Sequence, residues 1–445
     1  MKRPTRKPAP ARPRKPPHDP AAAPVLVQIE KPVYGGNFLA RIEGKAVFVP
    51  LVLPGEQAQI RITQSKPGYS TAEVDEIVSP SLQRIAPVCP HFGACGGCHY
   101  QHAGYETQLA LKQAILLETL ERGGVQPPQE IALLAGQPWR YRNRIRLAFD
   151  AAGNPGYRSR RSHAVIPIRE CPIAAPLLLQ AAQAAAEIIP RFAPAFRPAE
   201  IALFTDSTET ALLATLYTAS LSSQGFDSFA QTLQERIPQL VGAELALDVP
   251  GAQPPRTLTP WGASSLTYGA AGFDYRVDHG AFFQVNRWLV DPLVDLVTAG
   301  HSGALAWDLF AGVGLFARRL TASFERVVAV ESAPSATPAL GQNLRFTSGT
   351  AVKADTLAYL RRAGESARPG LIVVDPPRAG LGPEITVLLG QIAAPALVYI
   401  SCDPATLARD LRALAASGYA IESVTLADLF PQTFHIETVV RLRRA

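Results

Sequence analysis

The chain has 445 residues, of which 47% are hydrophobic, and a formal net charge of +6. This length exceeds what a single hydrophobic core supports, so two or three domains are expected. No run of about 18 apolar residues occurs, and no apolar segment follows the basic start, which argues against a membrane span or a secretory signal. We therefore expect a cytoplasmic protein without a membrane partner.

Residues 1–23 form a basic, proline-rich arm. They hold seven basic residues and one acidic residue, so the whole net charge of the chain lies in this arm. Such a composition cannot bury enough apolar surface to fold, and we expect the arm to be disordered. It suits salt-sensitive contacts with phosphates, although a solvated tail without a partner is an equal alternative.

The next segment, residues 24–84, alternates short β-type runs with Gly and Pro signals. The runs are VLVQIEKPVY, NFLARI, KAVFVPLVL, AQIRITQ and STAEVDEIV. This pattern predicts a small β-barrel of the OB-like kind. Barrels of this size often bind oligonucleotides, but many are only structural.

Residues 85–270 are expected to form a central α/β domain that begins with a Cys- and Gly-rich loop and a helix at 106–122. Cys89, Cys95 and Cys98 lie in the loop, and Cys171 follows far downstream. Their uneven spacing does not fit a disulfide framework and leaves zinc or an iron–sulfur cluster open. We expect the helix to pack on the catalytic domain.

Residues 271–445 have a regular α/β rhythm. Apolar strand-like runs alternate with helical patterns in GALAWDLF, RVVAVES, TAVKAD, LIVVDPP and ALVYISCDP. This rhythm predicts a doubly wound, Rossmann-like parallel sheet with its ligand site at the carboxyl ends of the strands.

A nucleotide-type site is indicated at those strand ends. Asp308 closes the first strand and leads into Ala311-Gly312-Val313-Gly314, where glycines let a ligand lie against backbone. Acids then end three further strands. They are Glu331, Asp355 and Asp375. The set fits S-adenosylmethionine better than a dinucleotide, although Glu331 and Asp355 also suit helix caps.

The motifs DPPR and SCDP follow adjacent strands and carry Asp375 and Cys402. C5 of uracil is a weak nucleophile, and a thiolate that adds to C6 raises the electron density at C5. Asp375 is placed to face the pyrimidine edge, and Glu437 in FHIE offers a base that removes the C5 proton. These residues predict methylation of a uridine at C5.

Together DLFAG, DPPRAG, SCDP and HIE resemble the RNA 5-methyluridine methyltransferase family, from about Val25 to the C-terminus. The resemblance implies a class I methyltransferase fold, a TRAM barrel, Cys402 as nucleophile and Glu437 as base. It also implies a [4Fe-4S] cluster on Cys89, Cys95, Cys98 and Cys171, as in the ribosomal RNA branch. Its implied cofactor site comprises Gln284, Phe310, Gly312, Glu331 and Asp375, with Asp355 nearby.

One position departs from that family, because Leu315 stands where better-known ribosomal members carry Asn. Any cofactor contact there must come from backbone or be absent. Further side chains are candidate RNA contacts, since RNA-modifying enzymes splay bases out and stack them on aromatic rings, although packing is an equal alternative for each. They are Phe282, Tyr141, Arg142 and Arg144.

The substrate and the partners remain open at this point. The cysteines favour 23S ribosomal RNA over the T-loop of transfer RNA, and we expect a monomer. Methylation of cytosine is disfavoured because no second cysteine lies near DPPR, and amino methylation because it needs no thiol. A non-catalytic RNA-binding iron–sulfur protein is the alternative of another class, and the intact set of Cys402, Asp375 and Glu437 argues against it.

Overall fold

The computed structural model describes residues 23–128, 130–160, 162–192, 197–249, 255–363 and 366–444. The basic arm therefore lies outside the described residues, apart from residue 23. The chain divides into two compact units, and the division falls after Arg84. In the described parts, no helix is long and apolar enough to cross a membrane.

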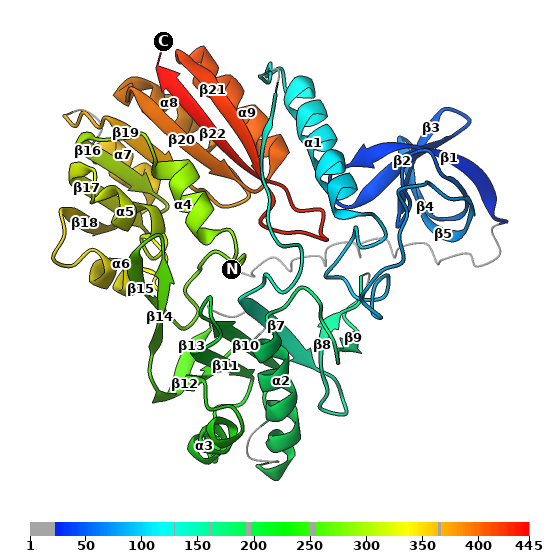
Figure 1. The fold of residues 1–445 in the computed structure, drawn as a ribbon, viewed down its shortest axis with the longest axis horizontal. Helices are drawn as coiled ribbons and strands as arrows, with labels where there is room; N and C mark the ends of the chain where they lie inside the picture. The colour runs from blue at the N-terminus through cyan, green and yellow to red at the C-terminus, as the bar shows by residue number, and fades with distance from the viewer. Residues whose placement is uncertain are drawn as a thin grey trace, which may run out of the picture. The chain divides into compact units, whose positions relative to one another are not determined.

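The first unit is a closed barrel with the strand order β1-β2-β3-β5-β4 (Figure 1). Alternate side chains point inward, as the two-residue period of a strand requires, and Val27, Ile29, Val47 and Val49 are buried. The predicted barrel is confirmed. Its strands are β1 (Val25–Val33), β2 (Asn37–Ile42), β3 (Lys45–Pro50), β4 (Gln57–Ser65) and β5 (Tyr69–Ser79).

A buried carboxylate holds the end of the barrel. Glu56 is fully buried and accepts hydrogen bonds from Arg84 Nε at 2.6 Å and Nη2 at 2.7 Å, and from the N–H groups of Leu53 and Ser81. Burial by itself would raise the pKa of Glu56, but the hydrogen bonds and the charge of Arg84 bring this pKa below its ordinary value. The segment after β5 is thereby tied back to the β3–β4 loop.

The second unit contains a mixed sheet with the order β13-β12-β11-β10-β7-β8-β9. Helices α2 (Pro176–Ile188) and α3 (Phe226–Arg236) pack on one face, against inward-facing residues such as Ile145 and Leu147. The strands are β7 (Arg144–Phe149), β8 (Pro155–Arg158), β9 (Val165–Pro167), β10 (Glu200–Thr205), β11 (Leu212–Thr218), β12 (Leu240–Leu247) and β13 (Arg256–Gly262), and the short helix η1 (Ile189–Arg191) follows α2.

An eight-stranded sheet with the order β18-β17-β16-β19-β20-β22-β21-β6 forms the other half of this unit. Its first five strands are parallel, and β22 runs antiparallel to both neighbours. The predicted Rossmann-like sheet is confirmed. The strands are β6 (Ala132–Leu134), β16 (Gly303–Leu309), β17 (Phe324–Glu331), β18 (Gly349–Lys353), β19 (Leu371–Val374), β20 (Ala396–Ser401), β21 (Tyr419–Ala427) and β22 (Glu437–Arg444).

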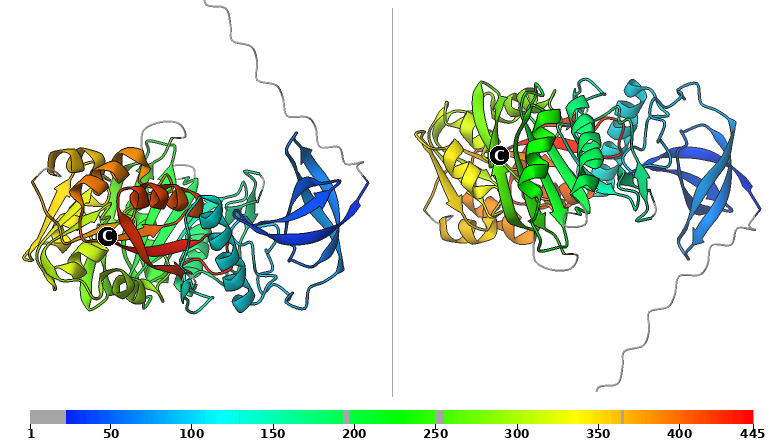
Figure 2. Two further views of the ribbon diagram at one scale, coloured as in Figure 1. Left: turned by 90° about the horizontal axis from the view of Figure 1, so that it is seen from above. Right: turned by 90° about the horizontal axis from the view of Figure 1, so that it is seen from below.

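Helices cover both faces of the eight-stranded sheet (Figures 1 and 2). One face carries α7 (Thr356–Ala363), α8 (Gly382–Ile392) and α9 (Pro404–Ala416), which contact one another in turn. The other carries α4 (Val290–Thr298), α5 (Leu315–Leu320), α6 (Thr337–Asn343) and the hairpin of β14 (Ser265–Ala270) and β15 (Phe273–Asp278).

Two elements from residues 105–134 pack against the eight-stranded sheet or its helices, although they lie far from them in the sequence. Helix α1 (Tyr105–Arg122) packs against α9, and β6 adds to the outer edge of β21. The boundaries predicted at residues 270 and 271 stay a prediction, because residues 85–445 form one compact unit.

Candidate active site

Three strands bring reactive side chains to one edge of the eight-stranded sheet. Asp375 directly follows β19, and Cys402 directly follows β20. Glu437 is the first residue of the antiparallel strand β22, in which Thr438 pairs with Ser401. The carboxyl ends of parallel strands and the amino end of an antiparallel neighbour share an edge. The thiol and the two carboxyl groups are therefore neighbours, as predicted for catalysis.

The environment of these groups disfavours negative charge. Burial raises the pKa of the Cys402 thiol to about 11; the charges of Glu437 and Asp375 act in the same direction, and Arg378 opposes them. Burial raises the pKa of Asp375 to about 7. Burial and then the charge of Asp375 raise the pKa of Glu437 well above its ordinary value. At neutral pH the free protein thus holds a protonated thiol beside a carboxyl pair that retains a proton.

Local sequence fixes the turn that carries the thiol. Asp403 is the N-cap of α9, where its Oδ1 accepts hydrogen bonds from the N–H groups of Ala405 at 3.0 Å and Thr406 at 2.9 Å. Pro404 occupies the first turn, where its missing N–H has no cost. Cys402 is consequently held between a buried strand and a capped helix.

A cavity of about 30 Å³ beside Asp375 contains most of the predicted cofactor residues. Its lining includes Gln284, Phe310 and Gly312. Phe310 has a φ of +64°, a left-handed conformation that strains a residue with a Cβ. Gly312 has a φ of +56°, and open space lies where a Cβ would stand. This backbone is suited to a ligand lying against the turn.

The two acids predicted for the nucleoside differ in their surroundings. Glu331 accepts hydrogen bonds from the N–H groups of Gly312 at 2.8 Å, Ser332 at 2.7 Å and Ala333 at 2.6 Å. A carboxylate has about four acceptor positions, so one remains for a ribose hydroxyl. Asp355 is exposed and accepts from the N–H of Ala358 at 3.1 Å in the first turn of α7. Its cofactor contact stays a prediction.

Asp308 and Leu315, on either side of the glycine turn, make hydrogen bonds within the protein. Asp308 is fully buried, its Oδ2 accepts from the N–H of Ala317 at 2.8 Å, and burial raises its pKa to about 8. Leu315 lines the cavity with an apolar side chain, and its carbonyl accepts a hydrogen bond from the Tyr275 hydroxyl at 3.0 Å. These hydrogen bonds stabilise the turn from the protein interior. Leu315 contributes only an apolar side chain to the cavity.

The four predicted cluster ligands line a common cavity of about 120 Å³ in the second unit. They are Cys89, Cys95, Cys98 and Cys171. All four are free thiols, and burial raises the pKa of each. Among the described residues, no three His, Cys, Asp or Glu side chains are arranged to hold a single metal ion.

The candidate RNA contacts separate into accessible and buried side chains. Phe282 is 60% exposed and lines the cofactor cavity, whereas Arg142 and Arg144 line a larger pocket. Tyr141 is fully buried, and its hydroxyl donates to the carbonyl of Pro431 at 2.9 Å. The burial of the ring favours the packing alternative for Tyr141, and its contact with RNA stays a prediction.

Residues 428–436, which precede Glu437, are held by helix α1. Lys112 Nζ lies 2.5 Å from Asp428 Oδ1, both side chains are fully buried, and the same ammonium donates to the carbonyl of Phe430 at 3.0 Å. The Gln108 amide exchanges two hydrogen bonds of 2.9 Å with the side chain and N–H of Gln432.

The cysteine-rich loop holds the same segment from another side. The carbonyl of Gln432 accepts hydrogen bonds from the N–H groups of His99 at 2.8 Å and Tyr100 at 3.0 Å. Gln432 has a φ of +69°, a conformation that needs such support in a residue with a Cβ. Glu437 thus follows a segment positioned jointly by α1 and the loop that carries three of the cysteines. The sequence did not indicate these positioning contacts or the proximity of Arg378.

Two segments of the chain match known families. Residues 364–445 match the family described as tRNA (Uracil-5-)-methyltransferase, and residues 24–74 match the TRAM domain. These matches cover the strands that carry Asp375, Cys402 and Glu437 and most of the barrel.

Relatives and a solved structure resemble the chain over nearly its full length. A Thermotoga maritima protein named an uncharacterized RNA methyltransferase is 32% identical over 94% of this chain and 98% of its own. The 23S rRNA (uracil(1939)-C(5))-methyltransferase of Azoarcus sp. is 32% identical over 94% and 99%. The Pyrococcus abyssi tRNA (uracil-54, C5)-methyltransferase, solved with S-adenosyl-L-homocysteine, has a TM-score of 0.73 at 21% identity over 94% and 99%, and so has the same fold.

Proposed function

Because the chain belongs to the family of S-adenosylmethionine-dependent RNA (uracil-C5)-methyltransferases, we propose that its substrate is a uridine of 23S ribosomal RNA. The observation that carries this choice is the identity of 32% and 31% with two relatives named 23S rRNA methyltransferases, each aligned over more than 90% of this chain. The T-loop uridine of transfer RNA is the second candidate, since a transfer RNA enzyme has the same fold. With ribosomal RNA as substrate, the reaction takes place in the cytoplasm.

The proposed chemistry uses the three groups at the sheet edge. The Cys402 thiol gives its proton to water, and the sulfur adds to C6 of the uracil while the C5–C6 π electrons move toward O4 as an enolate. S-adenosylmethionine, when bound, supplies the methyl group that C5 takes. Glu437 then removes the C5 proton, and the electrons of that bond reform C5=C6 and release the sulfur. Asp375 is assigned to the uracil edge.

The same proposal places one part of the cofactor in the cavity beside Asp375, and because about 30 Å³ holds little more than a water molecule, the rest would lie outside it against the glycine turn. Phe310 and the turn at Gly312 lie against the cofactor, Glu331 uses its remaining acceptor position for ribose, and Gln284 closes the other side. Asp355 is assigned to the adenine end, where it would act while capping α7.

We also assign a [4Fe-4S] cluster to the cavity between Cys89, Cys95, Cys98 and Cys171. What supports this assignment is that four cysteine side chains line one cavity of about 120 Å³, since four thiolates are the usual ligands of such a cluster, and zinc is the alternative for the same set. Uracil methylation transfers no electron, so we assign the cluster a structural role, in which it would fix the loop that holds Gln432.

The substrate is tested by nucleoside mass spectrometry on ribosomal and transfer RNA from cells with and without the gene. We expect loss of 5-methyluridine at one position of 23S ribosomal RNA. Loss from transfer RNA instead would overturn the substrate and keep the reaction. Unchanged 5-methyluridine in both would contradict the activity and favour the non-catalytic alternative.

The covalent mechanism predicts opposite results for two substitutions. Cys402→Ala should lower methyl transfer at least a thousandfold while cofactor affinity stays within about twofold, because the thiol activates only the uracil. Glu437→Gln should leave the methylated adduct unable to lose its C5 proton, and a protein–RNA band should persist on denaturing gels. Residual activity of Cys402→Ala, or no band with Glu437→Gln, would refute the respective role.

The cluster assignment predicts the iron content of anaerobically purified protein. We expect close to four irons per chain and a broad absorption near 400 nm, both lost in Cys171→Ser. Cys402→Ser is the matched control, since this fifth cysteine lies outside the cavity, and it should keep the iron. One zinc per chain in place of iron would falsify the assignment.

A further inference from the structure

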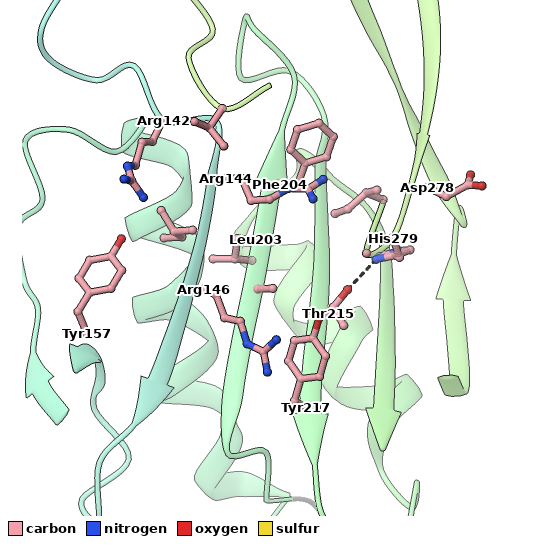
Figure 3. Close-up of a pocket in the computed structure, with 15 residues that line it drawn as sticks. Arg142, Arg144, Arg146, Tyr157, Leu203, Phe204, Thr215, Tyr217, Asp278 and His279 are labelled. Atoms are coloured by element: carbon pink, nitrogen blue, oxygen red, sulfur yellow. Dashed lines mark hydrogen bonds between the residues drawn. The ribbon is translucent and has the colours of Figure 1, made fainter. Parts of the chain in front are cut away.

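A pocket of about 450 Å³ lies on the face of the seven-stranded sheet opposite α2 and α3 (Figure 3). This volume is in the ordinary range of small-ligand sites, about 300–1,000 Å³. Because side chains alternate along a strand, β7 directs Ile145 and Leu147 toward the helices and Arg144 and Arg146 toward the pocket.

Arg144 carries a buried charge that the described residues do not neutralise. Its Nη1 donates to the carbonyl of Ala281, and its guanidinium lies 4.3 Å from the ring centroid of Phe204. Its Nε is buried without a hydrogen-bond partner, and no carboxylate in the described parts of the chain pairs with it. Burial lowers its pKa to about 10, so it remains a cation at neutral pH. Such a group favours an anionic ligand, and phosphate is a strong one.

Arg146, two residues further along β7, is already neutralised. Its Nε lies 2.5 Å from Glu200 and its Nη2 lies 2.8 Å from Asp248. Its guanidinium lies 4.0 Å from the ring centroid of Tyr217. Two guanidinium groups held on aromatic rings thus line one pocket, and RNA bases stack on both kinds of surface.

A second buried polar atom in the pocket, Nε2 of His279, has no hydrogen-bond partner among the described residues. Thr215 donates to Glu244 Oε1 at 3.1 Å, and its hydroxyl lies 3.0 Å from Nδ1 of His279. Since the single hydroxyl proton goes to Glu244, Nδ1 must be the donor to Thr215, and in a neutral ring Nε2 is then an acceptor. The His279 side chain is 7% exposed, burial lowers its pKa, and Nε2 has no partner among the described residues.

The pocket adjoins the cofactor cavity through one loop. Gly280 and Val285 line the pocket, whereas Phe282 and Gln284, from the same loop, line the cavity beside Asp375. The exposed ring of Phe282 therefore stands on the loop that separates the two sites. An RNA strand with its target uridine at Cys402 would have neighbouring nucleotides within reach of the pocket.

We propose that this pocket binds a second, turned-out nucleotide of the RNA substrate, close in sequence to the target uridine. Arg144 takes its phosphate, the stacked guanidinium groups contact its base, and His279 Nε2 accepts a hydrogen bond from an N–H group on the base edge. This assignment rests on the proposed function, because it presupposes an RNA substrate, and it adds a specificity site distant from the reacting atoms.

The test measures binding of an unmodified 23S ribosomal RNA transcript by filter retention at several salt concentrations. Arg144→Gln should raise Kd about 10- to 100-fold and lower the slope of log K against log salt by about one, while cofactor affinity and the rate at saturating RNA stay within threefold. Arg158→Gln is the matched control: Arg158 lies on the neighbouring strand β8, pairs with Glu200 at 2.8 Å and is not among the residues that line the pocket, so its Kd should change less than threefold.

A second variant keeps the test decisive if Arg144→Gln does not fold. Ala202→Phe retains Arg144 but fills the pocket from β10, and it should weaken binding as much while the melting temperature stays near that of the wild type. A Kd within twofold of the wild type in a folded variant would overturn the pocket's role. If the wild type methylates a transfer RNA transcript instead, the proposed substrate fails separately, and the same variants are measured on that transcript.

Discussion

The Cys402 thiol, which we propose as the nucleophile, lies in surroundings that oppose its own ionisation. Burial and two carboxyl groups raise the pKa of Cys402, and Arg378 is the cation that counters them. A thiol that stays protonated in the free protein is protected from oxidation and from unproductive addition, since the thiolate is the reactive form. Reaction then depends on an RNA-bound state in which the proton can leave.

This arrangement predicts a pH dependence of the rate. With the thiol pKa near 11, the thiolate fraction increases close to tenfold per pH unit below that value, so kcat/KM for RNA should rise steeply from pH 7 to 9. Initial rates at saturating cofactor and constant ionic strength measure this, with RNA affinity determined separately at each pH. A rate that is constant above pH 7.5 would show that thiol ionisation does not limit the reaction.

For single residues, the sequence motifs identified those that directly follow a strand, because the end of a strand determines where the next side chain lies. DPPR, SCDP and HIE brought Asp375, Cys402 and Glu437 together without further information. For Tyr141 the sequence left RNA contact and packing equally open, because an aromatic residue beside arginines looks the same in sequence whether its ring is buried or exposed. Nothing in the sequence marked His279 as a candidate site residue, since its hydrogen-bond partner Thr215 comes from another strand.

At the scale of elements, α1 supports the active site without contributing to it. Lys112 and Asp428 are both fully buried, so each depends on the other to avoid an isolated charge. The pair joins a helix near the start of the second unit to residues that precede Glu437. The sequence predicted that this helix packs on the catalytic domain, but it did not identify the ion pair, because the partner lies more than 300 residues away.

The pair predicts a large asymmetry between single and double substitutions. Lys112→Met leaves Asp428 buried without a partner and should lower the free energy of unfolding by about 3–5 kcal/mol. Adding Asp428→Asn removes the stranded charge and should recover at least half of that loss. Urea denaturation followed by circular dichroism measures both.

The control is Arg122→Ala at the end of the same helix. Arg122 is largely exposed and lies 3.7 Å from Glu118, so its loss should cost less than about 0.5 kcal/mol. A loss of under 1 kcal/mol in Lys112→Met would show that the pair does not hold the segment.

At the scale of the whole molecule, length and composition predicted that the chain has more than one compact unit, but not where each unit begins and ends. The barrel was recognisable because its alternation and turns are local. The boundary near residue 270 stays a prediction, since the seven-stranded and the eight-stranded sheet belong to one compact unit. The short strand β6 was missed because three residues carry no periodicity, and its pairing with β21 depends on chain far downstream.

The charge distribution predicts how the arm contributes to RNA binding. Residues 1–23 hold a net charge of +6, and the rest of the chain is neutral overall. Deleting them should weaken RNA binding at low salt and reduce the slope of log K against log salt by several units, with kcat unchanged. Filter retention at 50–300 mM salt measures this. An unchanged slope would show that the arm is a solvated tail.

The placement of β6 and α1 restricts how this protein can be divided or recombined. A fragment that starts at the β14–β15 hairpin would include every reacting residue, but it would leave the hydrogen-bonding groups of β21 uncovered and remove the partner of Asp428. Uncovered strand edges invite aggregation. Exchange of RNA-recognition modules between relatives should therefore tolerate replacement of the barrel, whereas residues 85–134 must travel with the catalytic half.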